Sequence, residues 1–264
     1  MGSMNVLVLA ASRAGPTDAV AQLQDLSHKC LVEIDGEVML KRVVRELATS
    51  QHAKDIYVSI EDENILRGVP YLAELMDQGR LKFVPAGENL FASLKAAEQA
   101  IDHPYPLAVS TGDNALHTAE MFDHFCEDVL ASEAEVAIAM TQAATILEAY
   151  PDGKRAFHEL KDGGWSSCNL YAAKSPAAID AGAVFETGGQ FGKRPARIMK
   201  AFGLWFMLMY KFRLASIDQL ANYLAKRWKV SIRIVRMPFA DAPIDVDNPG
   251  DFERTEAILK ARRA

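Results

Sequence analysis

The chain has 264 residues, of which 50% are hydrophobic and 24% charged, so it is long enough to bury a full core. Its formal net charge of -6 argues against general affinity for nucleic acid or an anionic membrane, but it leaves room for a small basic pocket that binds phosphate. The three cysteines are far apart and form no metal-binding or redox motif, which is typical of a reduced, cytoplasmic protein.

Short apolar runs rich in β-branched residues alternate with longer segments of helical character. This pattern predicts strands at residues 6–9, 56–60, 81–84, 107–110, 135–140 and 230–235. It predicts helices at residues 37–48, 90–101, 121–130, 195–212, 217–228 and 249–262, and a turn at residues 161–164. Continuous apolar strands separated by helices indicate one α/β domain with a Rossmann-like, mostly parallel sheet, whose ligands bind at the carboxyl ends of the strands.

Small residues follow the first predicted strand, in a loop that begins with Leu9, Ala10, Ala11, Ser12 and Arg13. Small side chains let the backbone approach a ligand, and free N–H groups there can cradle phosphate, although any tight turn also favours small residues. Further along, Lys29 interrupts an otherwise apolar segment. It is either a point charge for a triphosphate or a solvated lysine at a sheet edge.

A small-residue loop, the segment from Lys29 to Gly36 and a helix follow one another in this order. This order resembles the opening of the nucleotidyltransferases with a glycosyltransferase-A-like fold. These include molybdenum-cofactor guanylyltransferases, the cytidylyltransferases of isoprenoid and Kdo biosynthesis, and sugar-phosphate uridylyltransferases. The resemblance implies that the first loop, Arg13 and Lys29 bind a nucleoside triphosphate. The sequence departs from the family's Leu-Ala-Ala-Gly-x-Gly opening, because Ser12 and Ala14 stand at the glycine positions.

Three later motifs agree with the resemblance. Gly87 and Ser93 are similar to residues that line the base pocket of cytidylyltransferases, which favours CTP as the donor and GTP second. Asp113 ends the run VSTGD, and Asp247 precedes the last predicted helix. In the family, acids at these two positions bind the catalytic magnesium, and Asp245 is the alternative second ligand. Mg²⁺ prefers carboxylate, phosphate and water oxygens, so few protein ligands are needed.

The resemblance covers residues 4–141 and 230–262. It implies a single domain, 4–264, with a nucleotide-binding half at 4–141 and an acceptor-binding half at 142–264. A helical insertion at about 190–228 belongs to the acceptor half. The expected reaction joins a nucleoside monophosphate to a small phosphorylated acceptor and releases pyrophosphate, with Mg²⁺ as the cofactor.

The acceptor half offers fewer motifs. Asn169 lies in a strand similar to one that contacts the acceptor in the family, and Glu186 is a second polar candidate. Arg194, Arg197 and Lys200 fall in a basic cluster within an acidic chain. The cluster is either a clamp for an anionic acceptor, such as a phosphoglycerate-like acid, or a solvated start of a helix.

The most apolar stretch is residues 202–210, which is too short to span a bilayer. A buried core helix is the simpler interpretation. The alternative is an interfacial helix at residues 202–213 that contacts a membrane peripherally or forms an oligomer.

Two other functions fit parts of the sequence. Asp245-Val246-Asp247 matches the Asp-x-Asp metal motif of glycosyltransferases, but in those enzymes the motif ends a middle strand. The irregular first loop also fits an inactive binding module. The joint presence of Lys29, Asp113 and Asp247 favours a nucleotidyltransferase over both.

Overall fold

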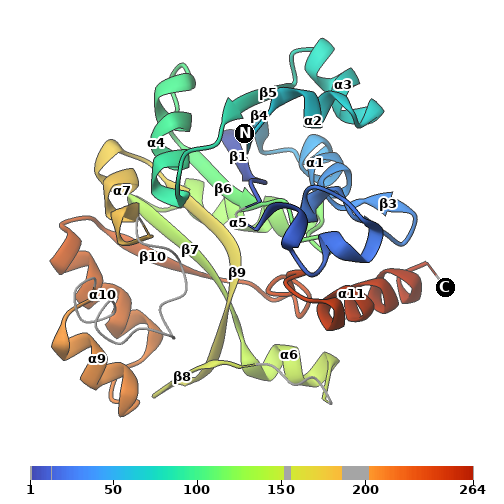
Figure 1. Cartoon of the computed structure of the whole chain (residues 1–264). Helices are drawn as coiled ribbons and strands as arrows, with labels where there is room; N and C mark the ends of the chain where they lie inside the picture. Colours follow the sequence, from blue (N-terminus) through green and yellow to red (C-terminus); the bar gives the residue numbers. More distant parts are fainter. Residues whose placement is uncertain (1, 13, 152–155, 186–201, 264) are drawn as a thin grey trace.

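A computed structural model describes residues 2–12, 14–151, 156–185 and 202–263 (Figure 1). In this part of the chain, eight strands form one mixed sheet in the order β10-β7-β9-β6-β1-β4-β5, and β8 pairs with β9. The strands are β1 Met4–Leu9, β4 Ala53–Ile60, β5 Leu81–Pro85, β6 Leu107–Thr111, β7 Val136–Gln142, β8 His158–Leu160, β9 Gly163–Ala173 and β10 Ile232–Arg236. β9 is antiparallel to β6, β7 and β8, whereas the other pairs are parallel. The predicted α/β class with a mostly parallel sheet is therefore confirmed.

The described helices lie on both faces of the sheet. The α-helices are α1 Met39–Thr49, α2 Glu63–Arg67, α3 Pro70–Asp77, α4 Leu90–Ala100, α5 Ala119–Ala131, α6 Ala143–Ala149, α7 Pro176–Ala181, α9 Leu204–Lys211, α10 Ile217–Trp228 and α11 Pro249–Ala261. Short 3-10 helices occupy η1 Gly15–Thr17, η2 Ala21–Gln24, η3 Lys29–Leu31 and η4 Gly182–Phe185, and β2 Glu33–Ile34 pairs with β3 Glu37–Val38.

Alternating side chains of β1 show how the two faces are covered. Val6 and Val8 belong to a buried cluster with residues of α1, α3 and α5. Leu7, between them, belongs to a cluster with residues of α4 and α7 on the other face. Both sides of β1 are fully buried, which explains why its sequence is a continuous apolar run.

The order in which the strands are added to the sheet reverses at β1. It pairs in parallel with β4 on one side and with β6 on the other, so the connections leave it toward opposite edges. In open α/β sheets, the crevice at the carboxyl ends of such strands is the usual place for a ligand.

Several predicted elements need correction. The helix predicted from residue 37 begins at Met39, because Glu37 and Val38 form β3. α2 and α3 were not predicted. The helix predicted at 195–212 does not continue through Gly203, whose φ is 90°, and α9 begins after it. The part of that prediction before residue 202 lies outside the described residues.

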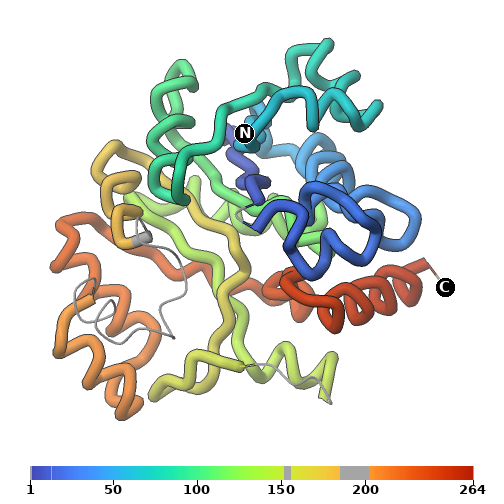
Figure 2. Tube along the Cα trace, in the orientation of Figure 1, coloured from blue at the N-terminus to red at the C-terminus, as the bar shows by residue number. Residues whose placement is uncertain are grey.

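The prediction that residues 202–210 form a buried core helix is wrong for the described chain. No residue of α9 is fully buried, and Leu204 and Trp205 are 59% and 60% exposed. One face of α9 packs on α10, where Phe206 and Met209 join a cluster with Leu220. Among the described elements, α10 and β8 lie beside α9 (Figures 1 and 2).

Candidate functional site

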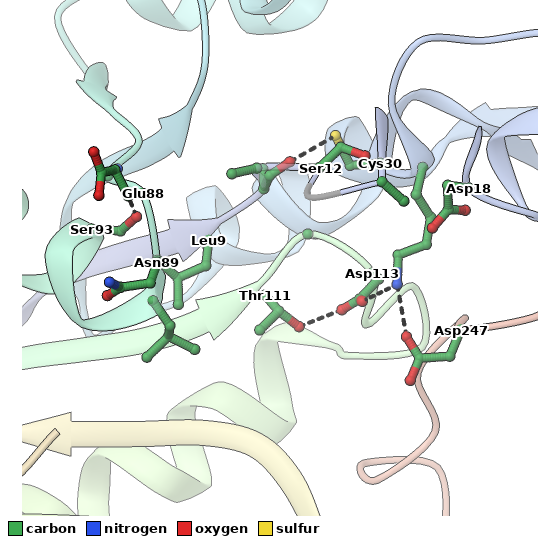
Figure 3. Close-up of a pocket in the computed structure, with 17 residues that line it drawn as sticks. Leu9, Ser12, Asp18, Cys30, Glu88, Asn89, Ser93, Thr111, Asp113 and Asp247 are labelled. Carbon is green, nitrogen blue, oxygen red and sulfur yellow. Dashed lines mark hydrogen bonds and ion pairs between the residues drawn. The ribbon is translucent and has the colours of Figure 1, made fainter. Parts of the chain in front are cut away.

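A cavity of about 400 Å³ opens at the carboxyl ends of β1 and β6. It combines residues that are far apart in sequence, and Figure 3 shows them around one space. Its lining includes nine predicted site residues, namely Leu9, Ala10, Ala11, Ser12, Lys29, Gly87, Ser93, Asp113 and Asp247. The structure therefore brings these residues together, while their individual roles remain predictions.

Lys29 joins two acids at the mouth of this cavity. Its Nζ donates to Asp113 Oδ2 at 2.6 Å and to Asp247 Oδ1 at 2.8 Å (Figure 3). Burial by itself lowers the pKa of Lys29, but the two carboxylates outweigh burial and raise this pKa above its ordinary value. The ammonium therefore stays charged at neutral pH, and the solvated-edge interpretation of Lys29 does not hold.

Backbone contacts fix Asp113 and Asp247 beside each other. The N–H of Gly112 donates to the carbonyl of Leu9, which ties the end of β6 to the end of β1. The N–H of Val246 donates to the carbonyl of Asp113 at 3.2 Å, so the segment before α11 lies against the same turn. The side chain of Asn248 then caps α11 by accepting from the N–H groups of Gly250 and Asp251.

Thr111 orients Asp113 and was not predicted. Its hydroxyl donates to Asp113 Oδ1, and it accepts from Asn114 Nδ2 at 2.9 Å. Thr111 also lines the cavity. Its position in the sequence, two residues before Asp113, could have identified it as a site residue.

In the predicted base pocket, the backbone at Gly87 comes very close to the first turn of α4. The N–H of Gly87 donates to Ser93 Oγ at 3.0 Å, and Asn89 caps α4 by accepting from the N–H of Ala92. A Cβ on Gly87 would lie 2.5 Å from the Cβ of Ala92 and 2.8 Å from the backbone nitrogen of Ser93. Only glycine fits at this position without moving α4.

Glu61, directly after β4, holds the first loop and was not predicted. Its Oε1 accepts from the N–H of Ser12 at 2.8 Å, and its Oε2 lies 3.0 Å from His28 Nε2. His28, which directly precedes Lys29, was not predicted as a site residue. Arg13, predicted to bind the triphosphate, lies outside the described residues.

Asn169 lies on a bulge of β9. The β7–β9 register shifts between Ile138 and Met140, and Asn169 has a φ of 51° there. Its amide donates to Asp245 Oδ2 at 3.0 Å and to Asn114 Oδ1 at 3.4 Å, so the bulge directs it toward the end of the sheet that carries Asp113. It does not line the cavity itself. The other predicted acceptor residues, Glu186, Arg194, Arg197 and Lys200, lie outside the described residues.

The two acids of the Asp245-Val246-Asp247 run have different partners. Asp245 accepts from Asn169, whereas Asp247 accepts from Lys29 across the cavity. Of the two, Asp247 alone lines the cavity, whereas a glycosyltransferase metal motif would use both acids, so this geometry disfavours that alternative.

Asp113 and Asp247 provide carboxylate oxygens that suit Mg²⁺. In the described part of the chain, no three or more His, Cys, Asp or Glu residues group into a metal site. The two acids nevertheless hold one cationic group, the ammonium of Lys29, between them. A divalent ion that keeps water and phosphate oxygens needs only one or two protein carboxylates, so this pair fits magnesium.

Comparison with known proteins agrees with this geometry. The family of MobA-like NTP transferase domains matches residues 6–202. No curated protein sequence matches the chain significantly.

Solved structures share the fold. A hypothetical transferase from Thermus thermophilus has a TM-score of 0.76 at 20% identity, over 95% of this chain and 99% of that one. A 4-diphosphocytidyl-2C-methyl-D-erythritol synthase from Anaerococcus prevotii has a TM-score of 0.60 at 13% identity, over 98% and 99%. A CMP:2-keto-3-deoxy-manno-octonic acid synthetase complexed with CTP has the same score and identity, over 98% and 100%.

The close approach at Gly87 generates a prediction. Gly87→Ala forces α4 or the loop to shift, so we expect it to lower the free energy of unfolding by about 1–3 kcal/mol. Gly68→Ala is the matched control, since its Cβ would meet its nearest neighbours at 3.4 Å and its φ of -66° suits alanine. Urea unfolding of both variants measures the effect. Equal free energies of unfolding for Gly87→Ala and Gly68→Ala would contradict the described packing of Gly87.

Proposed function

The chain belongs to the family of MobA-like NTP transferase domains, and from this we propose that it transfers CMP from CTP to a small phosphorylated acceptor and releases pyrophosphate. GTP is the second choice of donor. Nucleotidyl transfer as such follows from the family. The choice of base, the acceptor and the metal are our proposals.

The observation that carries the proposal is the meeting of Lys29, Asp113 and Asp247 at the cavity mouth. A triphosphate carries several negative charges, which need both a fixed cation and a bound divalent ion. Lys29 provides the fixed cation, and the two acids provide ligands for Mg²⁺. The first loop adds small residues and backbone N–H groups beside them.

In this proposal the chain acts by positioning and by electrostatic stabilisation. An acceptor phosphate oxygen attacks the α-phosphorus, and pyrophosphate leaves on the opposite side. Lys29 and Arg13 neutralise charge on the triphosphate oxygens. Bound Mg²⁺ would supply further neutralisation at Asp113 and Asp247. The attacking phosphate is already ionised at pH 7, so no general base is required.

Gly87 and Ser93 support the proposed base preference, because they form one hydrogen-bonded loop at the edge of the same cavity. On the acceptor side, Asn169 and Glu186 would contact the acceptor, and Arg194 and Arg197 would bind its negative charges. We also propose a cytoplasmic location, which suits a chain whose three cysteines are buried.

Asp113→Ala tests the proposed metal site. We expect at least a tenfold loss of pyrophosphate release, equivalent to about 1.4 kcal/mol in the barrier, with the fold retained. Asp77→Ala on α3 is the control, since Asp77 is 73% exposed and does not line the cavity. Retention of more than about a tenth of the wild-type rate in folded Asp113→Ala would remove Asp113 from the proposed machinery.

The donor preference is tested with all four nucleoside triphosphates. We expect the highest kcat/KM for pyrophosphate release with CTP, and the next highest with GTP. A clear preference for ATP or UTP would refute the proposed base pocket.

Arg197→Ala tests the proposed acceptor clamp. Loss of one partner of an arginine–carboxylate pair weakens binding strongly, so we expect the acceptor KM to rise far more than the triphosphate KM. Phosphorylated hydroxy acids should also be better acceptors than sugar 1-phosphates. Steady-state kinetics on both acceptor classes measures this, with Arg67→Ala as a surface control. An unchanged acceptor KM would show that the basic cluster does not bind the acceptor.

A further inference from the structure

α9 exposes a large apolar surface that the proposed reaction does not use. Leu204, Trp205, Phe212 and Leu214 on and after this helix are each 59% or 60% exposed. They lie on the side of the molecule away from α1, α3 and the first loop (Figure 1). Exposed apolar side chains that gather in one place usually mark an interaction surface.

A second cavity, of about 310 Å³, lies behind the same helix. It is bounded by α9, α10 and the strands β7 and β10, through residues such as Phe206, Ala221, Met140 and Ile234. The polar side chains of its described lining are those of His158 and Tyr210, which hydrogen-bond to each other at 2.8 Å. A polar ligand would lose its hydrogen bonds to water there, so the cavity suits a hydrocarbon group.

The segment that contains α9 and α10 is basic, although Glu159 of β8 lies 3.9 Å from Arg213. Residues 202–229 contain five basic residues and one acidic residue, whereas the chain has a net charge of -6. Lys211 and Arg213 alternate with exposed Phe212 and Leu214 at one end of the helix. At the other end, Gly203 lies beside Arg227 near the end of α10. The apolar surface therefore has basic residues at both of its ends.

We propose that α9 and the cavity behind it form a binding site for an anionic phospholipid. α9 lies in the headgroup region of a membrane, where its basic residues meet lipid phosphates, and the cavity binds one hydrocarbon chain. Within the described residues, no helix has the length and hydropathy of a membrane span.

Lipid binding at this site is separable from nucleotidyl transfer, since the two cavities share no lining residue. The test therefore uses the full chain and a readout that needs no substrate. Cosedimentation is measured with vesicles of phosphatidylglycerol and phosphatidylcholine in equal amounts, and with vesicles of phosphatidylcholine alone. We expect binding to the first at least tenfold tighter than to the second, and weaker binding in high salt.

Substitutions on α9 locate the membrane contact. Leu204→Asp and Trp205→Ser should each weaken binding to the anionic vesicles at least tenfold. Leu147→Asp on α6 is the matched control, because Leu147 is also a large exposed apolar residue, at 41%. Absence of vesicle binding by the wild type, or an equal loss in the control, would overturn the proposal. A dimer in light scattering that Leu204→Asp dissociates would instead assign the face to a second copy.

Filling the cavity tests the hydrocarbon site. Wild type should bind monomeric lysophosphatidylglycerol saturably, and Ala221→Phe should reduce this affinity at least tenfold while thermal unfolding confirms a folded chain. If Ala221→Phe does not fold, the same measurement is made with Ala221→Leu, which adds a smaller side chain at this position. Unchanged affinity in a folded, filled variant would overturn the proposed chain-binding cavity.

Discussion

The ion pairs of Lys29 with Asp113 and Asp247 connect three parts of the chain that the fold brings to one edge of the sheet. η3 supplies the lysine, the turn after β6 supplies one acid, and the segment before α11 supplies the other. The ammonium lies between two carboxylates that would otherwise repel each other, and it offsets part of their negative charge. In the proposed reaction, Lys29 would exchange a carboxylate for a triphosphate oxygen, and the two acids would exchange the ammonium for a divalent ion.

The sheet explains why this edge is available. β1 lies between β4 and β6, and the loops after these strands leave in different directions. Glu61 after β4 holds the N–H of Ser12, so the loop after β1 is fixed from one side, while Gly112 fixes the turn after β6 from the other. The position of the site therefore depends on backbone contacts more than on side-chain packing.

Much of this arrangement could be predicted from sequence. β1, β4 and β6 each contain a short apolar run, and the strand-end position of Asp113 identified one wall of the cavity. Glu61 follows β4 in the same way but belongs to no motif, so it was missed. α2 has only five residues, which are too few to show the helical repeat of apolar residues from which a helix is predicted. The burial of α9 could not be predicted, because composition does not reveal which neighbours cover a helix. The bulge at Asn169 depends on register, which is a tertiary property.

The most direct test of the central ion pairs is calorimetric titration of Lys29→Met with Mg²⁺ alone and with CTP alone. Without the ammonium, Asp113 and Asp247 are free to bind a divalent ion, so Mg²⁺ should bind more tightly than to wild type. CTP loses its fixed cation and should bind more weakly. Opposite changes in the two affinities are the predicted result. A Lys29→Met variant with both affinities unchanged would contradict the account of this site.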